Sequence, residues 1–333
     1  MQSFRRVLIA LSLALLVHLP RLAEGQRLTL IGFGDWGIDS PDRQQVADAM
    51  ADYAAKSQTP INLALSLGDN YYVQLASADD PQFVTLFEKT YDPTRMNFPF
   101  YALPGNHDYE VFDGHVKLEW EMKYAAIHPE SRWKFPAKWY RLDLPADHPL
   151  VTILMLDSNK DNDKASSLTP AEWNQELQWM TEQLSGPRAE WTMCCAHHTI
   201  YSNGAHGDNG VLVESWGALF QKYKVDFYLC GHDHSLQHLE PGGLFTSFVV
   251  SGGGGAKRKQ MLRDNRGPFS RAVTGFAVMS FDPKQTTVQL ISAEGTLYHS
   301  FVRTRDGTLT TLSNSPSDPR TKHPLRVIQG VGD

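Results

Sequence analysis

The sequence predicts an α/β fold in which two mixed β-sheets pack face to face between outer helices, as a four-layer αββα sandwich. Strand-like runs alternate with amphipathic helical segments through the first part of the chain, and consecutive strand-like runs then complete it. No internal repeat or linker divides residues 26–312. Polar residues of ligand type follow several strands directly, at the strand ends where sites form in α/β folds.

The composition is that of an ordinary globular protein. The chain has 333 residues, of which 41% are hydrophobic and 20% charged, and this length allows one large α/β domain or two small ones. The formal net charge at pH 7 is −6. An acidic chain without a basic tract argues against nucleic acid as the main partner.

Residues 1–25 have the pattern of a secretory signal peptide. Arg5 and Arg6 precede an uncharged run over residues 7–17, and Ala23 and Gly25 supply small residues for cleavage after Gly25. The run is too short for a stable membrane span. We therefore expect a secreted, periplasmic or otherwise extracytoplasmic protein, with an uncleaved anchor as the alternative.

The first half of the domain alternates strands and helices. A strand over residues 27–33 leads into a turn, and a helix begins at Ser40-Pro41-Asp42, where serine is a good cap and proline fits the first turn. Val46, Met50 and Tyr53 continue that helix at helical spacing. The next elements are a strand over 61–67, a helix over 81–89, a strand over 98–103 and a helix over 114–127.

The second half contains more strands than helices. Strands are expected over 140–144, 150–156, 191–196, 225–230, 245–251, 276–281, 288–292 and 297–303, with helices over 170–184 and 211–223. Residues 158–169 are polar and form a surface loop. The tail from residue 313 is rich in proline and serine, and we expect it to lie over the surface or fray.

Nine ligand-type side chains gather in short stretches that mostly follow strands. Carboxylate, phenolate, amide and imidazole groups together describe a site for Fe, Mn or Zn, and a phenolate favours Fe(III). The chain has no Cys-x-x-Cys pair, which argues against a structural zinc site. Each stretch alone also fits a turn or a solvated histidine, but their joint occurrence predicts metal binding. The nine are Asp35, Asp69, Tyr72, Asn106, His107, His197, His206, His232 and His234.

These stretches resemble the motifs of a known family. Gly34-Asp35-Trp36-Gly37, Gly68-Asp69-Asn70-Tyr71-Tyr72, Gly105-Asn106-His107-Asp108, Ala196-His197 and Gly231-His232-Asp233-His234 are similar to those of the calcineurin-like metallophosphoesterases. Tyr72, three residues after Asp69, narrows the resemblance to the purple acid phosphatases, and the compact length to their small, tartrate-resistant type. The resemblance runs from about Leu28 to Phe301, so the chain is expected to comprise a signal peptide over 1–25, a metallophosphoesterase domain over 26–312 and a C-terminal tail over 313–333.

The resemblance also implies a role for each residue. Asp35, Tyr72 and His234 would hold Fe(III), and Asp69 would bridge to a second ion. Asn106, His197 and His232 would hold that divalent partner, which is Fe(II), Zn or Mn. His107 and His206 match the two substrate-facing histidines of the family, whereas His198 has no counterpart and stays unassigned.

The implied activity is that of a secreted acid phosphatase acting on phosphate monoesters. Two cations lower the pKa of bound water, so hydroxide forms at acidic pH, where protonated His107 and His206 stabilise developing charge and protonate the leaving group. The expected substrates are small phosphorylated molecules, with phosphoproteins and nucleotides also considered. A phosphodiesterase or nucleotide pyrophosphatase shares the motifs and remains an alternative. A redox-active iron protein is a second one, although it would not need His107 and His206.

Several features stay open at this stage. Cys194, Cys195 and Cys230 leave at least one thiol unpaired, and a bridge to Cys230 and buried thiols are equally expected. Asp108 either orients His107 or holds the turn. The run from Gly252 to Gly255 is interpreted as structural, and the charges at Lys257, Arg258 and Lys259 as a solvated run. Residues 158–169 resemble a shortened form of the repressing loop of the mammalian enzymes, which argues against activation by proteolysis.

Overall fold

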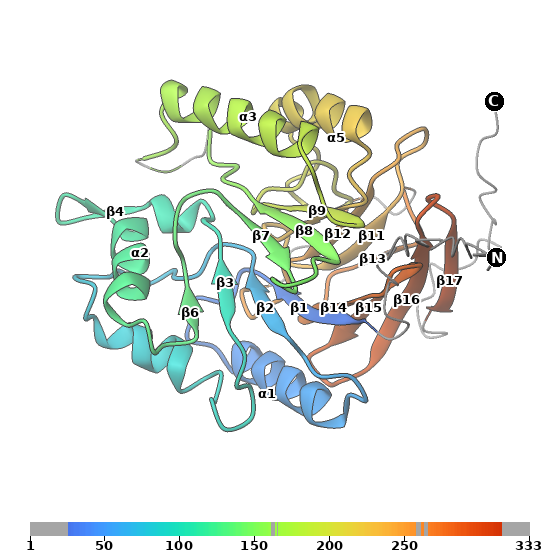
Figure 1. Ribbon diagram of the computed structural model, residues 1–333. Helices are drawn as coiled ribbons and strands as arrows, with labels where there is room; N and C mark the ends of the chain where they lie inside the picture. Colours follow the sequence, from blue (N-terminus) through green and yellow to red (C-terminus); the bar gives the residue numbers. More distant parts are fainter. Residues whose placement is uncertain (1–25, 161–163, 165, 258–260, 263–265, 315–333) are drawn as a thin grey trace, which may run out of the picture.

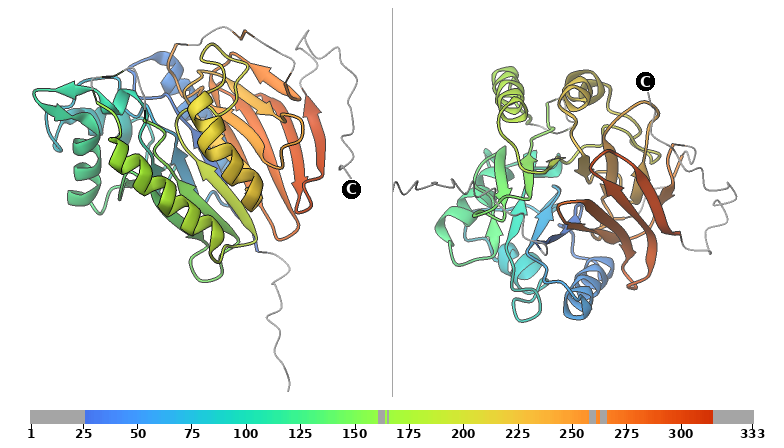
Figure 2. Two further views of the ribbon diagram at one scale, coloured as in Figure 1. Left: turned by 90° about the horizontal axis from the view of Figure 1, so that it is seen from above. Right: turned by 45° about the vertical axis from the view of Figure 1, so that its right-hand side comes forward.

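The computed structural model describes residues 26–160, 164, 166–257, 261–262 and 266–314, and its elements form four layers (Figure 1). Helix α1 (Pro41–Lys56) lies below one sheet, and α3 (Pro170–Ser185) and α5 (Ala218–Tyr223) lie above the other. Seen from above, α3 and α5 run side by side across the upper sheet (Figure 2). The prediction of two mixed sheets flanked by helices is confirmed.

The lower sheet has eight strands in the order β17-β16-β15-β14-β1-β2-β3-β6. In this sheet β1, β2, β3 and β6 run parallel to one another. Strand β14 is antiparallel to its neighbour β1, and β15, β16 and β17 continue the antiparallel pairing to the other edge. The bounds are β1 Leu28–Phe33, β2 Leu63–Ser66, β3 Phe100–Ala102, β6 Trp133–Lys134, β14 Gly275–Phe281, β15 Gln285–Ser292, β16 Leu297–Thr304 and β17 Leu309–Asn314.

The upper sheet has seven strands in the order β13-β11-β12-β10-β9-β8-β7. The four central strands, β8, β9, β10 and β12, run parallel to one another. The outer pairs, β7 with β8, β11 with β12 and β11 with β13, are antiparallel. The bounds are β7 Tyr140–Leu144, β8 Val151–Met155, β9 Trp191–Cys195, β10 Phe227–Cys230, β11 Leu236–Leu239, β12 Ser247–Ser251 and β13 Phe269–Arg271.

The two long helices start where side-chain caps satisfy their free amides. The Ser40 side chain accepts from the Arg43 amide at the start of α1, as the sequence predicts. Thr169 and Glu172 form a reciprocal capping box at the start of α3. The helix expected over 211–223 is a continuous helical stretch made of α4 (Gly210–Leu212), a π-helical turn (Val213–Gly217) and α5.

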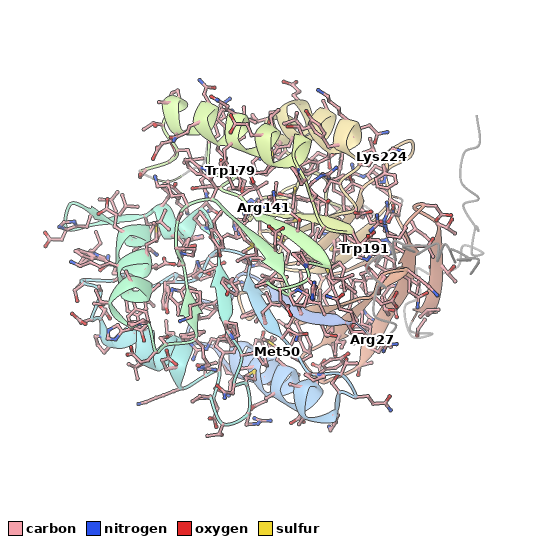
Figure 3. All side chains as sticks on the ribbon, viewed as in Figure 1. Arg27, Met50, Arg141, Trp179, Trp191 and Lys224 are labelled. Carbon is pink, nitrogen blue, oxygen red and sulfur yellow. The ribbon has the colours of Figure 1, made fainter. Side chains whose placement is uncertain are left out.

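Three hydrophobic clusters lie between the four layers and pack them together. One lies between α1 and the lower sheet, and Met50 points from α1 into it (Figure 3). The second joins the facing surfaces of the two sheets and includes Trp191 with Phe281. The third, with Trp173 and Phe220, lies between the upper sheet and its helices. Burial of these faces fixes the sheets against each other and so fixes the loops at their ends.

Some elements differ from the sequence-based expectation. The helix expected over 81–89 is centred on a π-helical turn, Phe83–Glu88, and the helix expected over 114–127 begins only at α2, Lys117–Ile127. A hairpin of β4 (Val111–Phe112) and β5 (His115–Val116) precedes α2. Strand β17 continues to Asn314, so Ser313 and Asn314 belong to the sheet rather than to a tail. The predicted signal segment and residues 315–333 lie outside the described residues.

Candidate metal centre

The loops that follow five strands converge at one end of the two packed sheets. Asp35, Asp69 and Asn106 lie beyond β1, β2 and β3 of the lower sheet, and His197 and His232 lie beyond β9 and β10 of the upper one. Each sheet contributes parallel strands here, so their carboxyl ends bring side chains to one place. The centre therefore lies between the two sheets at their common edge.

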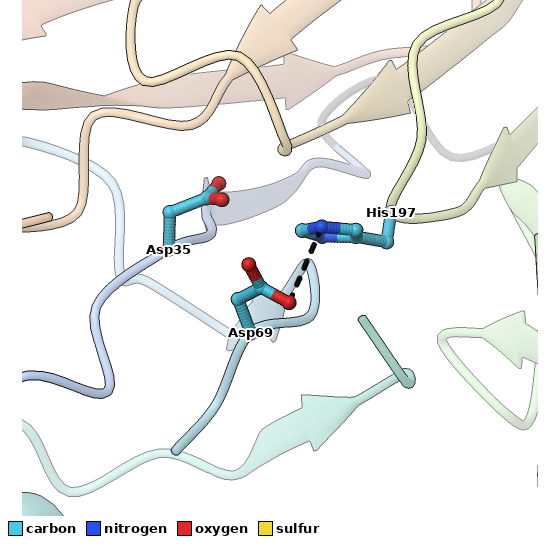
Figure 4. A group of neighbouring side chains, drawn as sticks. All are labelled: Asp35, Asp69 and His197. Atoms are coloured by element: carbon cyan, nitrogen blue, oxygen red, sulfur yellow. Dashed lines mark ion pairs between the residues drawn. The ribbon is translucent and has the colours of Figure 1, made fainter. Parts of the chain in front are cut away.

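Three of these side chains form a compact cluster (Figure 4). Asp35, Asp69 and His197 are buried, and each offers one ligand atom, all within 4.8 Å of one another. The pair in Figure 4 that a dashed line joins is His197 Nε2 and Asp69 Oδ1, 3.3 Å apart. The described residues contain no other group of this kind.

Tyr72 completes one side of the cluster. Its hydroxyl lies 3.0 Å from Asp69 Oδ2, 3.3 Å from His234 Nε2 and 3.5 Å from Asp35 Oδ1. His234 Nε2 is also 3.3 Å from Asp35 Oδ1. The four residues that the family resemblance links to Fe(III) thus surround one point.

His197 occupies the middle of the other side. Its Nε2 lies 3.0 Å from Asn106 Oδ1 and 3.1 Å from His232 Nδ1, in addition to its contact with Asp69. Asp69 thus presents one carboxylate oxygen to Tyr72 and the other to His197. This arrangement suits a carboxylate shared by two ions.

Two histidines of the donor set are oriented as metal ligands. His197 Nδ1 faces the Leu67 carbonyl oxygen at 2.9 Å, and His234 Nδ1 faces that of Lys257 at 2.6 Å. A carbonyl only accepts, so each Nδ1 carries the hydrogen and each Nε2 directs a lone pair at the cluster. There the lone pairs meet carboxylate and amide oxygens, and a cation satisfies such a group of acceptors.

The backbone at these loops is shaped around the cluster. Asp35, Asp69 and His232 have φ angles of 63°, 52° and 66°, in the left-handed region that side-chain-bearing residues seldom occupy. The His232 amide donates to Asp35 Oδ2, and the His107 amide donates to Asp69 Oδ1, both at 2.9 Å. Strain of this kind persists where surrounding contacts impose it, and it clusters at functional sites.

The electrostatics of the protein groups alone leave Tyr72 neutral. Burial raises the pKa of Tyr72 well above its ordinary value, and the Asp69 and Asp35 charges raise it further. Burial also acts to raise the pKa of Asp69, but the neighbouring His197 and His107 side chains, with the hydrogen bonds from the His107 amide and the Tyr72 hydroxyl, outweigh it and lower that pKa. A phenolate at Tyr72 therefore requires a strongly charged cation in the cluster.

The two predicted substrate-facing histidines flank the cluster. The His107 ring packs on the Tyr72 ring with centroids 4.4 Å apart, and the His206 ring lies over the His232 ring at 3.9 Å. His198, which the motifs left unassigned, is buried beside Ser158, and burial lowers its pKa to about 3. The structure thus brings together all nine residues singled out in the sequence.

Asp108 holds the turn. Its carboxylate accepts hydrogen bonds from the Gly105 amide at 2.7 Å and the Asn70 amide at 2.9 Å, while His107 Nδ1 lies 2.7 Å from Glu110 Oε1. Glu110 is the residue that the sequence reasoning missed. Its place three residues after His107, within one helical turn, was the available signal.

The remaining open features resolve as follows. Cys194, Cys195 and Cys230 are free, buried thiols. A Cβ on Gly252 would lie 2.8 Å from Asp35 Oδ2, so this glycine permits close approach to the cluster as well as forming the loop. Lys257 is exposed, whereas Arg258, Lys259 and part of the 158–169 loop lie outside the described residues.

Comparisons with known proteins identify the family. Residues 28–236 match the model of the family described as calcineurin-like phosphoesterase. The chain is 32% identical over 304 residues to tartrate-resistant acid phosphatase type 5 of Sus scrofa, covering 83% of this chain and 86% of the relative. It is 31% identical over 237 residues to purple acid phosphatase 3 of Arabidopsis thaliana, covering 68% and 63%.

Solved structures share the fold at lower identity. Purple acid phosphatase PPD1 from yellow lupin seeds superposes with a TM-score of 0.62 at 18% identity, over 84% of this chain and 54% of that one. GAP50, the anchor in the inner membrane complex of Plasmodium, gives 0.69 at 18% identity, over 87% and 90%. Within the described residues, no helix is both long and apolar enough to cross a membrane.

Proposed function

Because this chain belongs to the calcineurin-like phosphoesterases and, among them, to the purple acid phosphatases, we propose that it is a secreted acid phosphatase that hydrolyses phosphate monoesters at a dinuclear centre of Fe(III) and a divalent metal. The observation that carries this proposal is the convergence of Asp35, Asp69 and His197 within 4.8 Å. Tyr72 and His234 on one side, and Asn106 and His232 on the other, extend that cluster into two sets that share Asp69.

The residues of the first set would hold Fe(III), and those of the second the divalent ion, Fe(II), Zn or Mn. When bound, such ions clamp phosphate oxygens and lower the pKa of coordinated water. The protein groups fix this chemistry in place, because the His107 and His232 amides orient the two aspartates and backbone carbonyls orient His197 and His234. That preorganisation avoids reorganisation during the reaction.

His107 and His206 would act on the substrate from the two sides of the cluster. Their rings pack on Tyr72 and His232, which places imidazole nitrogens next to the centre without adding them to it. Protonated, they would donate to phosphate oxygens and to the leaving group. An acidic optimum follows, because the donors lose their protons as the pH rises.

A comparison of ester substrates tests the reaction. The purified protein should hydrolyse 4-nitrophenyl phosphate faster, in kcat/KM, than bis(4-nitrophenyl) phosphate, and His206→Ala should flatten the pH profile for the monoester. A preference for the bis-ester would instead identify a phosphodiesterase on the same fold.

The visible spectrum tests the iron assignment separately. A tyrosinate bound to Fe(III) gives a charge-transfer band, so the oxidised protein should be purple and Tyr72→Phe should lose the colour. Tyr71→Phe is the matched control, because the buried Tyr71 hydroxyl makes no hydrogen bond to any described residue and its ring packs on Trp36 and Phe83, away from the cluster. A colourless protein with two bound ions would contradict the iron assignment and leave a metallophosphoesterase of another metal type.

The proposal of export has its own measurement. Cleavage after Gly25 predicts a mature chain that begins at Gln26. N-terminal sequencing of protein recovered outside the cytoplasm should show that residue, and a retained Met1 would contradict cleavage.

A further inference from the structure

Glu110 makes a contact with the site that the family motifs do not include. It follows the short helical turn His107–Tyr109, and its Oε1 lies 2.7 Å from His107 Nδ1. No described residue hydrogen-bonds His107 Nε2, so this carboxylate is the partner that the described structure gives the ring. Nδ1 therefore carries the hydrogen that it donates to Glu110, and Nε2 stays available.

Glu110 is itself held by a buried lysine. Lys117 is 1% exposed, and its Nζ donates to Glu110 Oε2 at 2.9 Å and to the Tyr71 carbonyl oxygen at 2.5 Å. Tyr71 directly precedes Tyr72. Lys117 therefore connects the backbone next to Tyr72 with the Glu110 carboxylate that contacts His107. Lys164 Nζ adds a second cation 3.6 Å from Glu110 Oε1.

The His107 ring is thereby held on two sides. Tyr72 packs on it at a centroid separation of 4.4 Å, and Glu110 holds Nδ1. Burial acts to raise the pKa of Glu110, but Lys117 and His107 outweigh it and lower that pKa, which favours the ionised, accepting form. A ring fixed in this way loses less freedom when it meets a substrate.

We infer that Glu110, supported by Lys117, is a positioning residue that accepts from His107 Nδ1 and so orients the ring with Nε2 towards the phosphate ester, where the protonated ring donates. This inference rests on the proposed function, because that function gives His107 its contact with the substrate. Carboxylate partners orient histidines in the same way around other sites.

A purely structural role for Glu110 makes a different prediction. The Lys117 amide donates to the Glu110 carbonyl oxygen at 3.0 Å, which closes the base of the β4–β5 hairpin through the backbone alone. If the side chain served only that hairpin, its removal would destabilise the protein without acting through His107.

A double-mutant cycle separates the two roles. Glu110→Ala should lower kcat/KM for 4-nitrophenyl phosphate by about 10-fold, a part of what a positioned acid–base group supplies. In a His107→Ala background the same change should have no further effect, because the residue it acts through is gone. Additive losses in the two backgrounds would overturn the inference. Glu119→Ala is the matched control, since among the described residues Glu119 forms an ion pair with the exposed His115 alone, at 3.7 Å.

The buried lysine needs its own variant. Glu110→Ala leaves the Lys117 charge without its carboxylate, which can destabilise the fold. The double variant Glu110→Ala/Lys117→Met removes that charge, and it should melt near the wild-type temperature while keeping the loss of activity. Wild-type activity in the double variant would refute positioning.

A spectroscopic measurement keeps this inference separate from the proposed reaction. In ¹⁵N-histidine spectra of the protein reconstituted with zinc, neutral His107 should carry its proton on Nδ1, and Glu110→Ala should shift it towards Nε2. A wild type with this tautomer but no phosphatase activity would refute the proposed function alone. An unchanged tautomer in Glu110→Ala would refute the positioning role alone.

Discussion

Gly231 leaves no room for a side chain beside the candidate metal centre. It directly precedes His232, and a Cβ at this position would lie 2.6 Å from Asp35 Oδ2 and 3.0 Å from the Leu67 carbonyl oxygen. Both neighbours belong to the site, because Asp35 is a proposed ligand and the Leu67 carbonyl orients His197. Gly231→Ala therefore perturbs the first set of ligands through one methyl group.

The size of the effect follows from these distances. Ordinary van der Waals contact begins at about 3.4 Å, so the Asp35 carboxylate must move by about 0.8 Å, well beyond the roughly 0.2 Å tolerance of metal–ligand distances. The movement also weakens the 2.9 Å hydrogen bond from the His232 amide to Asp35 Oδ2. A hydrogen bond to a charged group contributes about 1.5–3 kcal/mol, which corresponds to at least about a 10-fold loss of metal affinity.

Metal content is the direct assay. Wild type and Gly231→Ala are dialysed against graded concentrations of a chelator, and bound metal is measured by elemental analysis. Gly210→Ala is the control, because a Cβ there meets no atom of the described residues within 4 Å. Equal metal retention by Gly231→Ala and wild type would show that the Asp35 position is not required for binding, and so would refute the assignment of that ligand.

Three further predictions concern stability. Burial raises the pKa of Glu121 to about 7, so between about pH 4.5 and 7 the unfolded chain loses this proton before the folded one and stability falls. Glu121→Gln should make that fall smaller in urea titrations of the metal-free protein, with the buried Asp108 carboxyl, whose pKa is also raised, supplying the rest. An unchanged dependence on pH would contradict this. Ser40→Ala removes the cap of α1 and should lower the free energy of unfolding by about 1 kcal/mol, whereas no change would show that the cap is not needed. Removal of bound metal leaves Asp35 and Asp69 facing each other without a counter-ion and should lower the melting temperature, a shift that restored metal reverses and that calorimetry measures.

The sequence was most informative where local patterns and tertiary structure agree. Strands were predicted from apolar runs, and β1, β8, β9 and β14 lie within a residue or two of their expected bounds, because all are fully or nearly fully buried. The site residues could be chosen because each lies just beyond a strand, and the packing of two sheets then brings the loops together.

Short edge elements could not be predicted. Strands β6 and β13 have two and three residues, and they exist because a neighbouring strand pairs with them rather than through their own pattern. Strand β5 of the β4–β5 hairpin fell within the helix expected over 114–127, because its sequence is compatible with a helix and the pairing with β4 across the Asp113-Gly114 turn was not recognised. Loop side chains such as Glu110 and Asp108 acquire partners only in three dimensions, so their roles could not be separated beforehand.

The order of strands in the lower sheet has a consequence for synthesis. Strand β1 lies between β2 and β14, and Leu28 pairs with Phe281 near the opposite end of the described chain. As the ribosome makes the protein from its N-terminus, β1 keeps one edge without hydrogen-bond partners until the last strands emerge. Open edges of this kind template aggregation, and pairing across such a long separation is slow. A chain that stops before β14 therefore carries the loops of the lower sheet but cannot complete the scaffold that holds them in register.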